Sequence, residues 1–308
     1  MDSERRKLDK TTDLASVVAR YVADGGSISL GGAIARETVA VAREIVRQKK
    51  KDLTLIGAAK TSAGEILVGA GCLRRIEMAY FWIGVVGQGY NYRRAVEQGI
   101  PLRPEVADYS MFSASLRFLA GSMGIGFLPT RSLLHSDIIR HNPDIKTMTD
   151  PYTGQEVAVV PAANPDVAFI HVQRCDPSGN AVITGNLWND PTLARAARKT
   201  VITCEEIIDE KEIRKNPNMT AIPRYCVDAV VHLPFGAHPE PVDGYYWMDQ
   251  PFRRDFTLRS QSREGFLDWL REWVWECPDH QAYLTKLGQR RVQALSIIEK
   301  RFRQGMTR

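Results

Sequence analysis

Seven short runs of apolar and β-branched residues recur along this chain, and helical patterns lie between several of them. The runs cover residues 27–30, 53–56, 76–79, 157–160, 167–170, 201–203 and 229–231. Strands that are nearly continuous in apolar residues are typical of sheets covered on both faces. Strands that alternate with helices pair in parallel. The sequence therefore predicts an α/β fold, a mostly parallel sheet with helices on both faces.

Two helical patterns lie near the start of the chain. Apolar side chains between residues 14 and 22 recur at helical spacing behind a cap at Thr12 or Asp13. A second helix is expected from about residue 37 to residue 50.

The last quarter of the chain has a different character. Residues 233–259 are rich in proline, glycine and aromatic residues, which favours an extended loop. Helical spacing returns over 266–274, and another helix is expected over about 287–302. The sequence contains no internal repeat. The interpretation is a single domain over 1–308, with 240–308 as a loop and helical extension.

Charge and cysteine usage narrow the function classes. The chain carries 41 Lys and Arg against 36 Asp and Glu, a net charge of +5. The basic residues are scattered in pairs, so we expect no nucleic-acid partner. The longest apolar run, 78–86, is shorter than the ~20 residues that cross a membrane. The first ten residues lack the apolar region of a secretory signal, which indicates a cytoplasmic protein. Five cysteines without a C-x-x-C pair favour reduced structural thiols over a metal site.

The strongest local signal is a strand that ends in two glycines, Gly31 and Gly32, with a helix behind it. Open α/β sheets bind ligands at the carboxyl ends of their strands. Paired glycines there allow close approach of a ligand, and we expect their N–H groups to be free to bind an oxyanion. The alternative is a tight turn. A second glycine loop, around Gln88, is similar to a phosphate loop but is better explained by turn glycines.

Other polar residues have structural explanations. His171 lies in an apolar strand and is expected to be a core imidazole, while His238 lies in a loop. Glu205 and Glu206 follow an apolar strand, where we expect a helix N-terminus that favours carboxylates rather than a nucleophile. The sequence contains no G-x-S-x-G, H-E-x-x-H or G-x-x-x-x-G-K-[ST] signature.

Longer motifs point to a family. The Gly31–Gly32 loop is followed by TCEEII at 203–208, EIR at 212–214, CVDAVV at 226–231 and PFGAHP at 234–239. In these segments the chain resembles the α (A) subunits of family I CoA-transferases, and the glutaconate CoA-transferase branch most closely. Smaller matches extend the resemblance over almost the whole chain.

The resemblance implies an α subunit that works with a separate β subunit in a hetero-oligomer, with the site between them. In that family a glutamate of the β subunit attacks the acyl-CoA carbonyl and gives a mixed anhydride and free CoA thiolate. The thiolate then attacks the anhydride to leave a glutamyl-CoA thioester on the β subunit, so no catalytic residue is expected in this chain. Coenzyme A enters as a substrate, and neither a permanent cofactor nor a metal is implied. The residues expected to bind the substrates are Gly31, Gly32, Ala33, Arg36, Phe81 and Gln88.

Two departures from the family pattern bear on the substrate. Ala33 replaces an aromatic residue, and residues 81–86 are more apolar than in the glutaconate branch. Together they favour a wider pocket for a bulkier or more apolar acyl group, although a buried core strand explains 81–86 equally well. Two further functions stay open: a related hydrolase that opens a cyclic diketone CoA thioester, and a non-catalytic acyl-CoA binding module.

Overall fold

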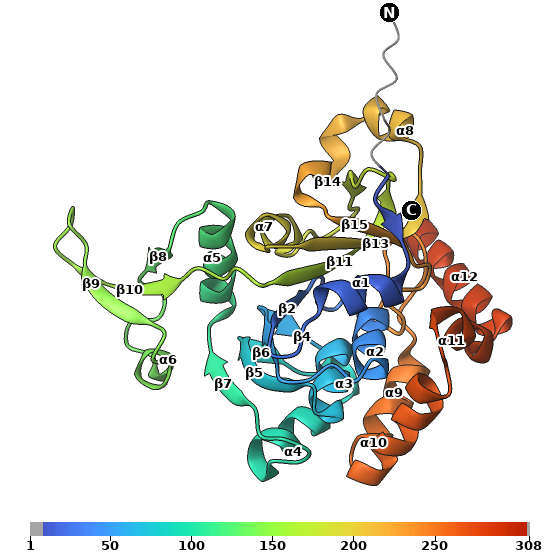
Figure 1. Cartoon of the computed structure of the whole chain (residues 1–308), viewed down its shortest axis with the longest axis horizontal. Helices are drawn as coiled ribbons and strands as arrows, with labels where there is room; N and C mark the ends of the chain where they lie inside the picture. Colours follow the sequence, from blue (N-terminus) through green and yellow to red (C-terminus); the bar gives the residue numbers. More distant parts are fainter. Residues whose placement is uncertain (1–8, 307–308) are drawn as a thin grey trace, which may run out of the picture.

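The computed structural model describes residues 9–306 and has a large parallel sheet at its centre (Figure 1). Eight strands follow one another in the order β1-β15-β13-β11-β2-β3-β5-β7, and every neighbouring pair is parallel. Their bounds, in that order, are Thr11–Thr12, Ala229–His232, Thr200–Ile207, Val167–Cys175, Ser27–Leu30, Leu53–Ile56, Leu73–Met78 and Glu105–Asp108. β12 (Ala181–Val182) and β14 (Thr220–Ile222) add an antiparallel extension. The predicted fold class is therefore confirmed.

The sheet is buried on both faces, as the continuous apolar runs indicate. Along β11, Val167 and Phe169 belong to one core cluster, whereas Ala168 and Ile170 belong to a second cluster on the opposite face. The first cluster is covered by α1 (Leu14–Tyr21), α2 (Val39–Arg47) and α3 (Ser62–Ala70), with α4 (Tyr90–Gln98) packed on α3. The second is covered by α7 (Asp190–Ala196) and α5 (Met111–Ser122).

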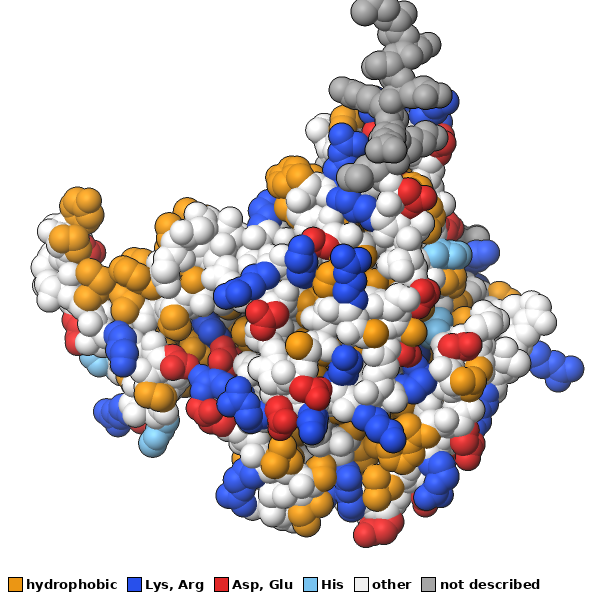
Figure 2. Space-filling model, in the orientation of Figure 1, with side chains coloured by type: hydrophobic (Ala, Val, Ile, Leu, Met, Phe, Trp, Pro, Cys, Tyr) orange, Lys and Arg blue, Asp and Glu red, His pale blue; other side chains and the backbone are white. Residues whose placement is uncertain are grey.

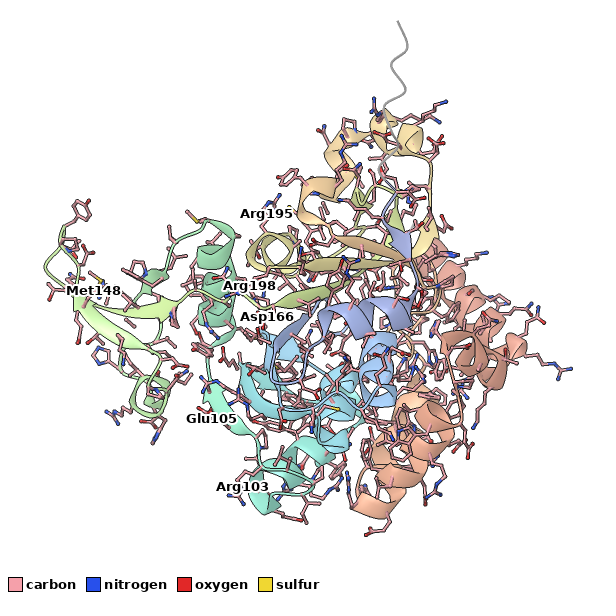
Figure 3. All side chains as sticks on the ribbon, in the orientation of Figure 1. Arg103, Glu105, Met148, Asp166, Arg195 and Arg198 are labelled. Carbon is pink, nitrogen blue, oxygen red and sulfur yellow. The ribbon has the colours of Figure 1, made fainter. Side chains whose placement is uncertain are left out.

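A small antiparallel sheet forms an arm that projects from the body (Figure 1). Its strands are β8 (Phe127–Thr130), β10 (Glu156–Pro161) and β9 (Lys146–Thr149), with α6 (Asp137–His141) beside them. The sequence predicted the strand at 157–160, but its expected place in the parallel sheet is wrong, because an apolar run does not specify its partner strand. Hydrophobic side chains gather at the end of the arm (Figure 2), and Met148 lies on it (Figure 3).

The C-terminal residues form five helical segments. They are α9 (Gln250–Arg259), α10 (Arg263–Leu270), a π-helix (Arg271–Trp275), α11 (His280–Leu287) and α12 (Gln289–Met306). The loop expected over 233–259 is wrong for its last ten residues, because the Asp249 side chain caps α9 and Pro251 fits its first turn. Phe252, Phe266 and Trp269 share the first core cluster with α2 and α3. Residues 250–287 are thus packed into the main body.

The remaining elements are short. They are β4 (Ala59–Lys60) paired with β6 (Tyr80–Phe81), α8 (Glu210–Lys215), and 3₁₀ turns at Gly84–Val86, Pro217–Met219 and Arg224–Cys226. All five cysteines are free thiols, as predicted. In the described part of the chain, no helix combines the length and apolar character needed to cross a membrane.

Candidate functional site

The strand order of the large sheet changes direction between β2 and β11. From β2 the strands proceed through β3, β5 and β7 on one side, and β11, β13 and β15 lie on the other. Ligands of open α/β sheets bind at such a switch point, beyond the carboxyl ends of the strands. The loop Gly31–Gly32–Ala33 leaves β2 at this point.

The two glycines are required by close contacts. A Cβ on Gly31 would lie 2.9 Å from Oδ1 of Asp190. Gly32 has φ +66°, and a Cβ there would lie 2.5 Å from the carbonyl oxygen of Ala35. Only glycine adopts this conformation in this space without strain.

The expectation that the loop amides are free is wrong. The N–H of Gly31 donates to the carbonyl of Phe169 at 2.7 Å, and the N–H of Gly32 donates to Oδ1 of Asp190 at 2.9 Å. The N–H of Ala33 donates to the carbonyl of Ala35 at 3.3 Å. The hydrogen bonds of these amides therefore stabilise the conformation of the loop, and the loop forms a fixed wall.

Asp190, the first residue of α7, is the anchor of this wall. Its Oδ2 accepts from Nη1 of Arg36 at 2.7 Å, and the side chains of Arg36 and Asp190 are only 1% and 2% exposed. Arg36 also donates to the carbonyls of His171 and Asn186, at 2.9 and 2.6 Å. The predicted substrate contact of Arg36 stays untested, and its observed contacts are with the protein itself.

The loop borders a small, partly open cavity of about 30 Å³. The other walls come from residues 57–60 after β3, residues 188–190 before and at the start of α7, and Met111 and Phe118 of α5. This volume holds one or two groups of the size of a water molecule, so an acyl-CoA cannot be enclosed by this chain alone.

Lys60 is a buried side chain in the cavity wall. Its Nζ donates to the carbonyl of Gly32 at 2.6 Å, and burial lowers its pKa while Glu37 and Asp190 oppose that shift. Neither Lys60 nor Asp190 stands out in the sequence. The pair Asp190-Pro191 is a helix-start signal that marks α7, but it says nothing of the partners of Asp190.

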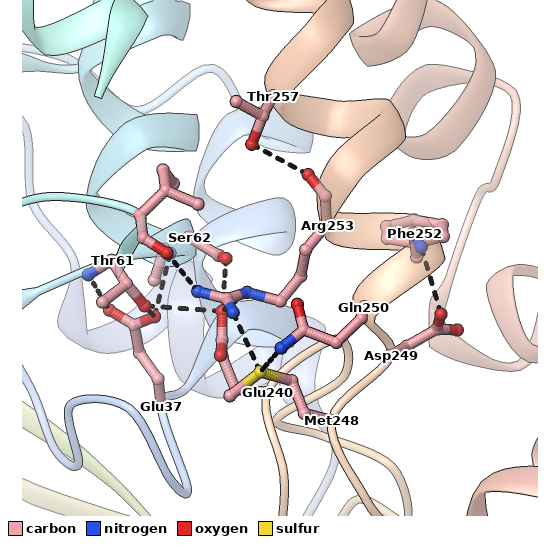
Figure 4. A network of polar contacts seen from close by, with 12 residues as sticks. Glu37, Thr61, Ser62, Glu240, Met248, Asp249, Gln250, Phe252, Arg253 and Thr257 are labelled. Carbon is pink, nitrogen blue, oxygen red and sulfur yellow. Dashed lines mark hydrogen bonds and ion pairs between the residues drawn. The ribbon is translucent and has the colours of Figure 1, made fainter. Parts of the chain in front are cut away.

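A network of polar side chains next to Lys60 supports the loop. It extends from the start of α3 to α9 (Figure 4). Thr61 donates from its N–H and its hydroxyl to the two carboxylate oxygens of Glu37, at 2.8 and 2.5 Å. Ser62 donates to Oε1 of Glu240, which is also paired with Arg253. Burial raises the pKa of Glu240 to about 7, although Arg253 opposes the shift.

The other two predicted contacts lie elsewhere. Phe81 stacks on Tyr92 with ring centroids 4.4 Å apart, and Oε1 of Gln88 accepts from Arg93 at 3.1 Å. Among the described residues neither borders the cavity, and Ile83 is buried in the main core. The apolar run 81–86 therefore does not border the cavity. The alternative of a buried core strand is wrong as well, because the strand ends at Phe81, a 3₁₀ turn follows, and Trp82 is 39% exposed. The contact of Phe81 and Gln88 with substrate stays a prediction.

His171 and the two glutamates occupy strands. Nδ1 of His171 pairs with the hydroxyl of Thr203 at 2.8 Å and Nε2 with Glu205 at 2.7 Å, so the core imidazole is confirmed. Oε1 of Glu205 also accepts from the hydroxyl of Tyr246. The expected helix N-terminus at Glu205–Glu206 is wrong, because β13 continues to Ile207.

His238 is buried in a polar network. Its Nε2 faces Asp249 at 3.0 Å and its Nδ1 faces the hydroxyl of Tyr283 at 2.6 Å. Burial lowers the pKa of His238 to about 4, although Asp249 opposes the shift.

We expect the free energy of unfolding to fall as the pH falls from 6.5 towards 4. In that window the unfolded histidine takes up a proton that the folded one does not, which costs up to ~1.4 kcal/mol per pH unit. In urea unfolding at successive pH values, His238→Gln should show a shallower pH dependence than wild type. The exposed control His135→Gln should keep the wild-type dependence. Equal slopes for wild type and His238→Gln would contradict the assignment.

Comparisons with known proteins show the family of the chain. A family model described as coenzyme A transferase matches residues 11–233. The chain is 34% identical to the A subunit of glutaconate CoA-transferase from Acidaminococcus fermentans, over 94% of this chain and 96% of that one. It is 33% identical to the A subunit of 3-oxoadipate CoA-transferase from Pseudomonas knackmussii, over 90% and 97%. A cholesterol ring-cleaving hydrolase IpdA subunit of Rhodococcus jostii is 26% identical, over 92% and 98%.

The same relationship is seen in three dimensions. The crystal structure of glutaconate CoA-transferase from Acidaminococcus fermentans superimposes with a TM-score of 0.89 at 34% identity, covering 93% of this chain and 95% of that one. The resemblance inferred from the sequence motifs is thereby confirmed, and the chain belongs to the coenzyme A transferase family.

Proposed function

We propose that this chain is the α (A) subunit of a two-subunit CoA-transferase, which moves CoA between an acyl-CoA and a carboxylic acid. Two relatives with 33% and 34% identity are the A subunits of such enzymes. The hydrolase relative is more distant, at 26% identity. These identities therefore favour transfer over ring cleavage.

One structural observation supports the proposal independently of the relatives. Among the described residues, Asp190 is the only carboxylate that borders the cavity, and both of its oxygens are engaged by Gly32 and Arg36. A carboxylate held in this way is not available to attack a thioester. This agrees with the resemblance to family I CoA-transferases, which implies that the attacking glutamate belongs to the partner subunit. We infer that the partner meets this chain over the cavity.

The residues of this chain have a supporting part in that reaction. Gly31, Gly32 and Ala33 form a rigid wall for the acyl group, and Asp190, Arg36 and Lys60 hold the wall in place. Excluding water matters because an acyl anhydride hydrolyses readily. Coenzyme A is a substrate of the CoA-transferase family. The absence of a permanent cofactor and a cytoplasmic location stay predictions.

The test is reconstitution with a candidate β subunit. We expect the pair to transfer CoA from an acyl-CoA to acetate, neither chain to do so alone, and a CoA adduct to be detected by mass spectrometry on the partner. Thioester exchange by this chain unaided overturns the proposal. A ring-opened product that keeps its CoA supports the hydrolase, and binding without turnover supports the non-catalytic module.

Glu206 provides an internal check on where the nucleophile lies. It is exposed near the end of β13, outside the cavity wall. Glu206→Gln should therefore leave the adduct on the partner intact and the transfer rate within about twofold of wild type. Selective loss of the adduct in a variant that folds and assembles would move the nucleophile to this chain.

A further inference from the structure

A second and larger cleft lies between α4 and α10, at the bottom of the molecule in Figure 1. Its volume is about 420 Å³, and small-molecule sites in proteins measure ~300–1,000 Å³. None of its described lining residues borders the cavity beside the Gly31–Gly32 loop. Its walls include one face of α4 and the start of α10, with the side chains of Tyr90, Arg93, Arg94, Glu97, Arg263 and Glu264.

Two arginines of this cleft carry charge that the chain does not neutralise. Arg94 donates from Nη1 to the carbonyl of Ser260 at 3.0 Å and from Nη2 to the side-chain oxygen of Asn91. Arg263 donates to the carbonyl of Gly69. All three acceptors are neutral, and among residues 9–306 neither guanidinium has a carboxylate partner within hydrogen-bond distance. Because a guanidinium stays protonated in proteins, both charges persist.

The surrounding charges do not balance this pair. Burial lowers the pKa of Arg263 and the charge of Arg94 lowers it further, while Glu264 opposes the shift. The third arginine of the wall, Arg93, is already paired with Glu97 at 2.8 Å. In the described wall, Glu264 is thus the one carboxylate left for two guanidiniums, and the cleft has a net charge of +1. A bound anion would remove this imbalance.

Three further features suit an anion that carries a ring. Nε of Arg94 is buried and has no acceptor among the described residues, so this guanidinium keeps unused donor capacity. The N–H groups of Arg263 and Glu264 begin α10, where the first amides lack acceptors within the helix and the helix dipole favours negative charge. Tyr90 adds an aromatic ring to the same wall, and nucleic-acid bases stack on such rings.

We propose that this cleft binds a nucleotide, with a phosphate between Arg94 and Arg263 at the start of α10 and the base beside Tyr90. Guanidinium groups bind phosphate oxygens through two parallel hydrogen bonds, which gives both affinity and orientation. The ligand is either a free nucleotide or the nucleotide end of CoA, since the two share this chemistry. The inference goes beyond the proposed CoA-transferase function, and its test does not measure transfer.

The test is isothermal titration calorimetry of the full chain with ADP, adenosine and 3′-phospho-ADP, which is the nucleotide end of CoA. We expect ADP to bind at least about tenfold more tightly than adenosine, because adenosine offers no acceptor to the charged donors. A smaller difference, or no binding, overturns the proposal. If 3′-phospho-ADP binds at least about tenfold more tightly than ADP, the ligand is the end of CoA. Otherwise it is a free nucleotide.

Single substitutions locate the site. Arg94→Gln and Arg263→Gln should each weaken ADP binding at least about tenfold, because each removes charged hydrogen-bond donors. The control Arg271→Gln removes an equal charge just after α10, at an exposed ion pair with Asp268, and should keep the wild-type affinity within about twofold. If Arg263→Gln binds ADP as tightly as Arg271→Gln does, the nucleotide lies elsewhere and the proposal is overturned.

The exposed Glu264 decides the case if neither arginine variant folds. Glu264→Gln removes a negative charge from the wall, so it should tighten ADP binding at least about twofold. An unchanged affinity in that variant overturns the proposal. Each of these failures leaves the proposed CoA-transferase function intact, because that function is tested by reconstitution and not by nucleotide binding.

Discussion

Replacing Asp190 by alanine should destabilise the chain by about 3–5 kcal/mol and reduce CoA transfer at least 100-fold. The substitution leaves Arg36 as a buried positive charge without its partner, and breaking a buried ion pair from one side has costs of this size. It also removes the acceptor of the Gly32 N–H. Because a displacement of about 1 Å at a reacting site costs ~100-fold in rate, an unanchored wall predicts a large loss.

Urea unfolding of the purified chain and steady-state transfer by the reconstituted pair measure the two effects. The matched control is Glu97→Gln, whose ion pair with Arg93 is exposed, with the Glu97 and Arg93 side chains 52% and 56% accessible. That variant should change the free energy of unfolding by no more than ~1 kcal/mol, the upper range for exposed pairs. An Asp190→Ala chain as stable as the Glu97→Gln chain would show that the buried pair does not hold the loop.

Gly32→Ala should reduce transfer by a similar factor, about 100-fold, for a steric reason. The added Cβ would lie 2.5 Å from the carbonyl oxygen of Ala35 and 2.6 Å from that of Arg36, so the loop must move. The positive φ adds roughly 1–2 kcal/mol of conformational cost for any residue with a Cβ. Transfer kinetics measure the effect of the displaced loop on the rate, and urea unfolding measures the conformational cost in stability.

Gly124 gives a matched control for the conformational cost alone. It has φ +70°, close to that of Gly32, and a Cβ there would meet nothing within 4 Å. Gly124→Ala should therefore lower the free energy of unfolding by roughly 1–2 kcal/mol and leave transfer near the wild-type rate. If both alanine variants transfer CoA equally well, the position of the loop does not determine the rate.

Local patterns predicted the parts of the fold that depend on neighbours in sequence. The strands at 27–30 and 53–56 have the predicted bounds, and α1 begins behind the predicted Asp13 cap. The strand at 157–160 was found, but its partner strands were not. Burial on both faces and pairing in an antiparallel arm produce the same apolar run, so periodicity alone does not separate them.

The site was predictable only in part for a related reason. A strand followed by Gly31 and Gly32 located the cavity correctly at a strand end. The use of those amides depends on Asp190, which is 158 residues from Gly32 in the sequence. Lys60 and Trp188, which both line the cavity, likewise belong to separate segments of the chain, and no spacing rule connects them. Contacts at such distances are set by the packing of the whole sheet.

The packing of α9 and α10 against α2 and α3 has a consequence for biosynthesis. Phe252, Phe266 and Trp269 complete a core to which the first three helices and strands β2, β3 and β5 contribute. During translation these earlier elements emerge from the ribosome long before α9 and α10, which cover them. Until then their apolar surface is exposed to chaperones and to aggregation. The newly made chain cannot close its largest core until α9 and α10 have been synthesised.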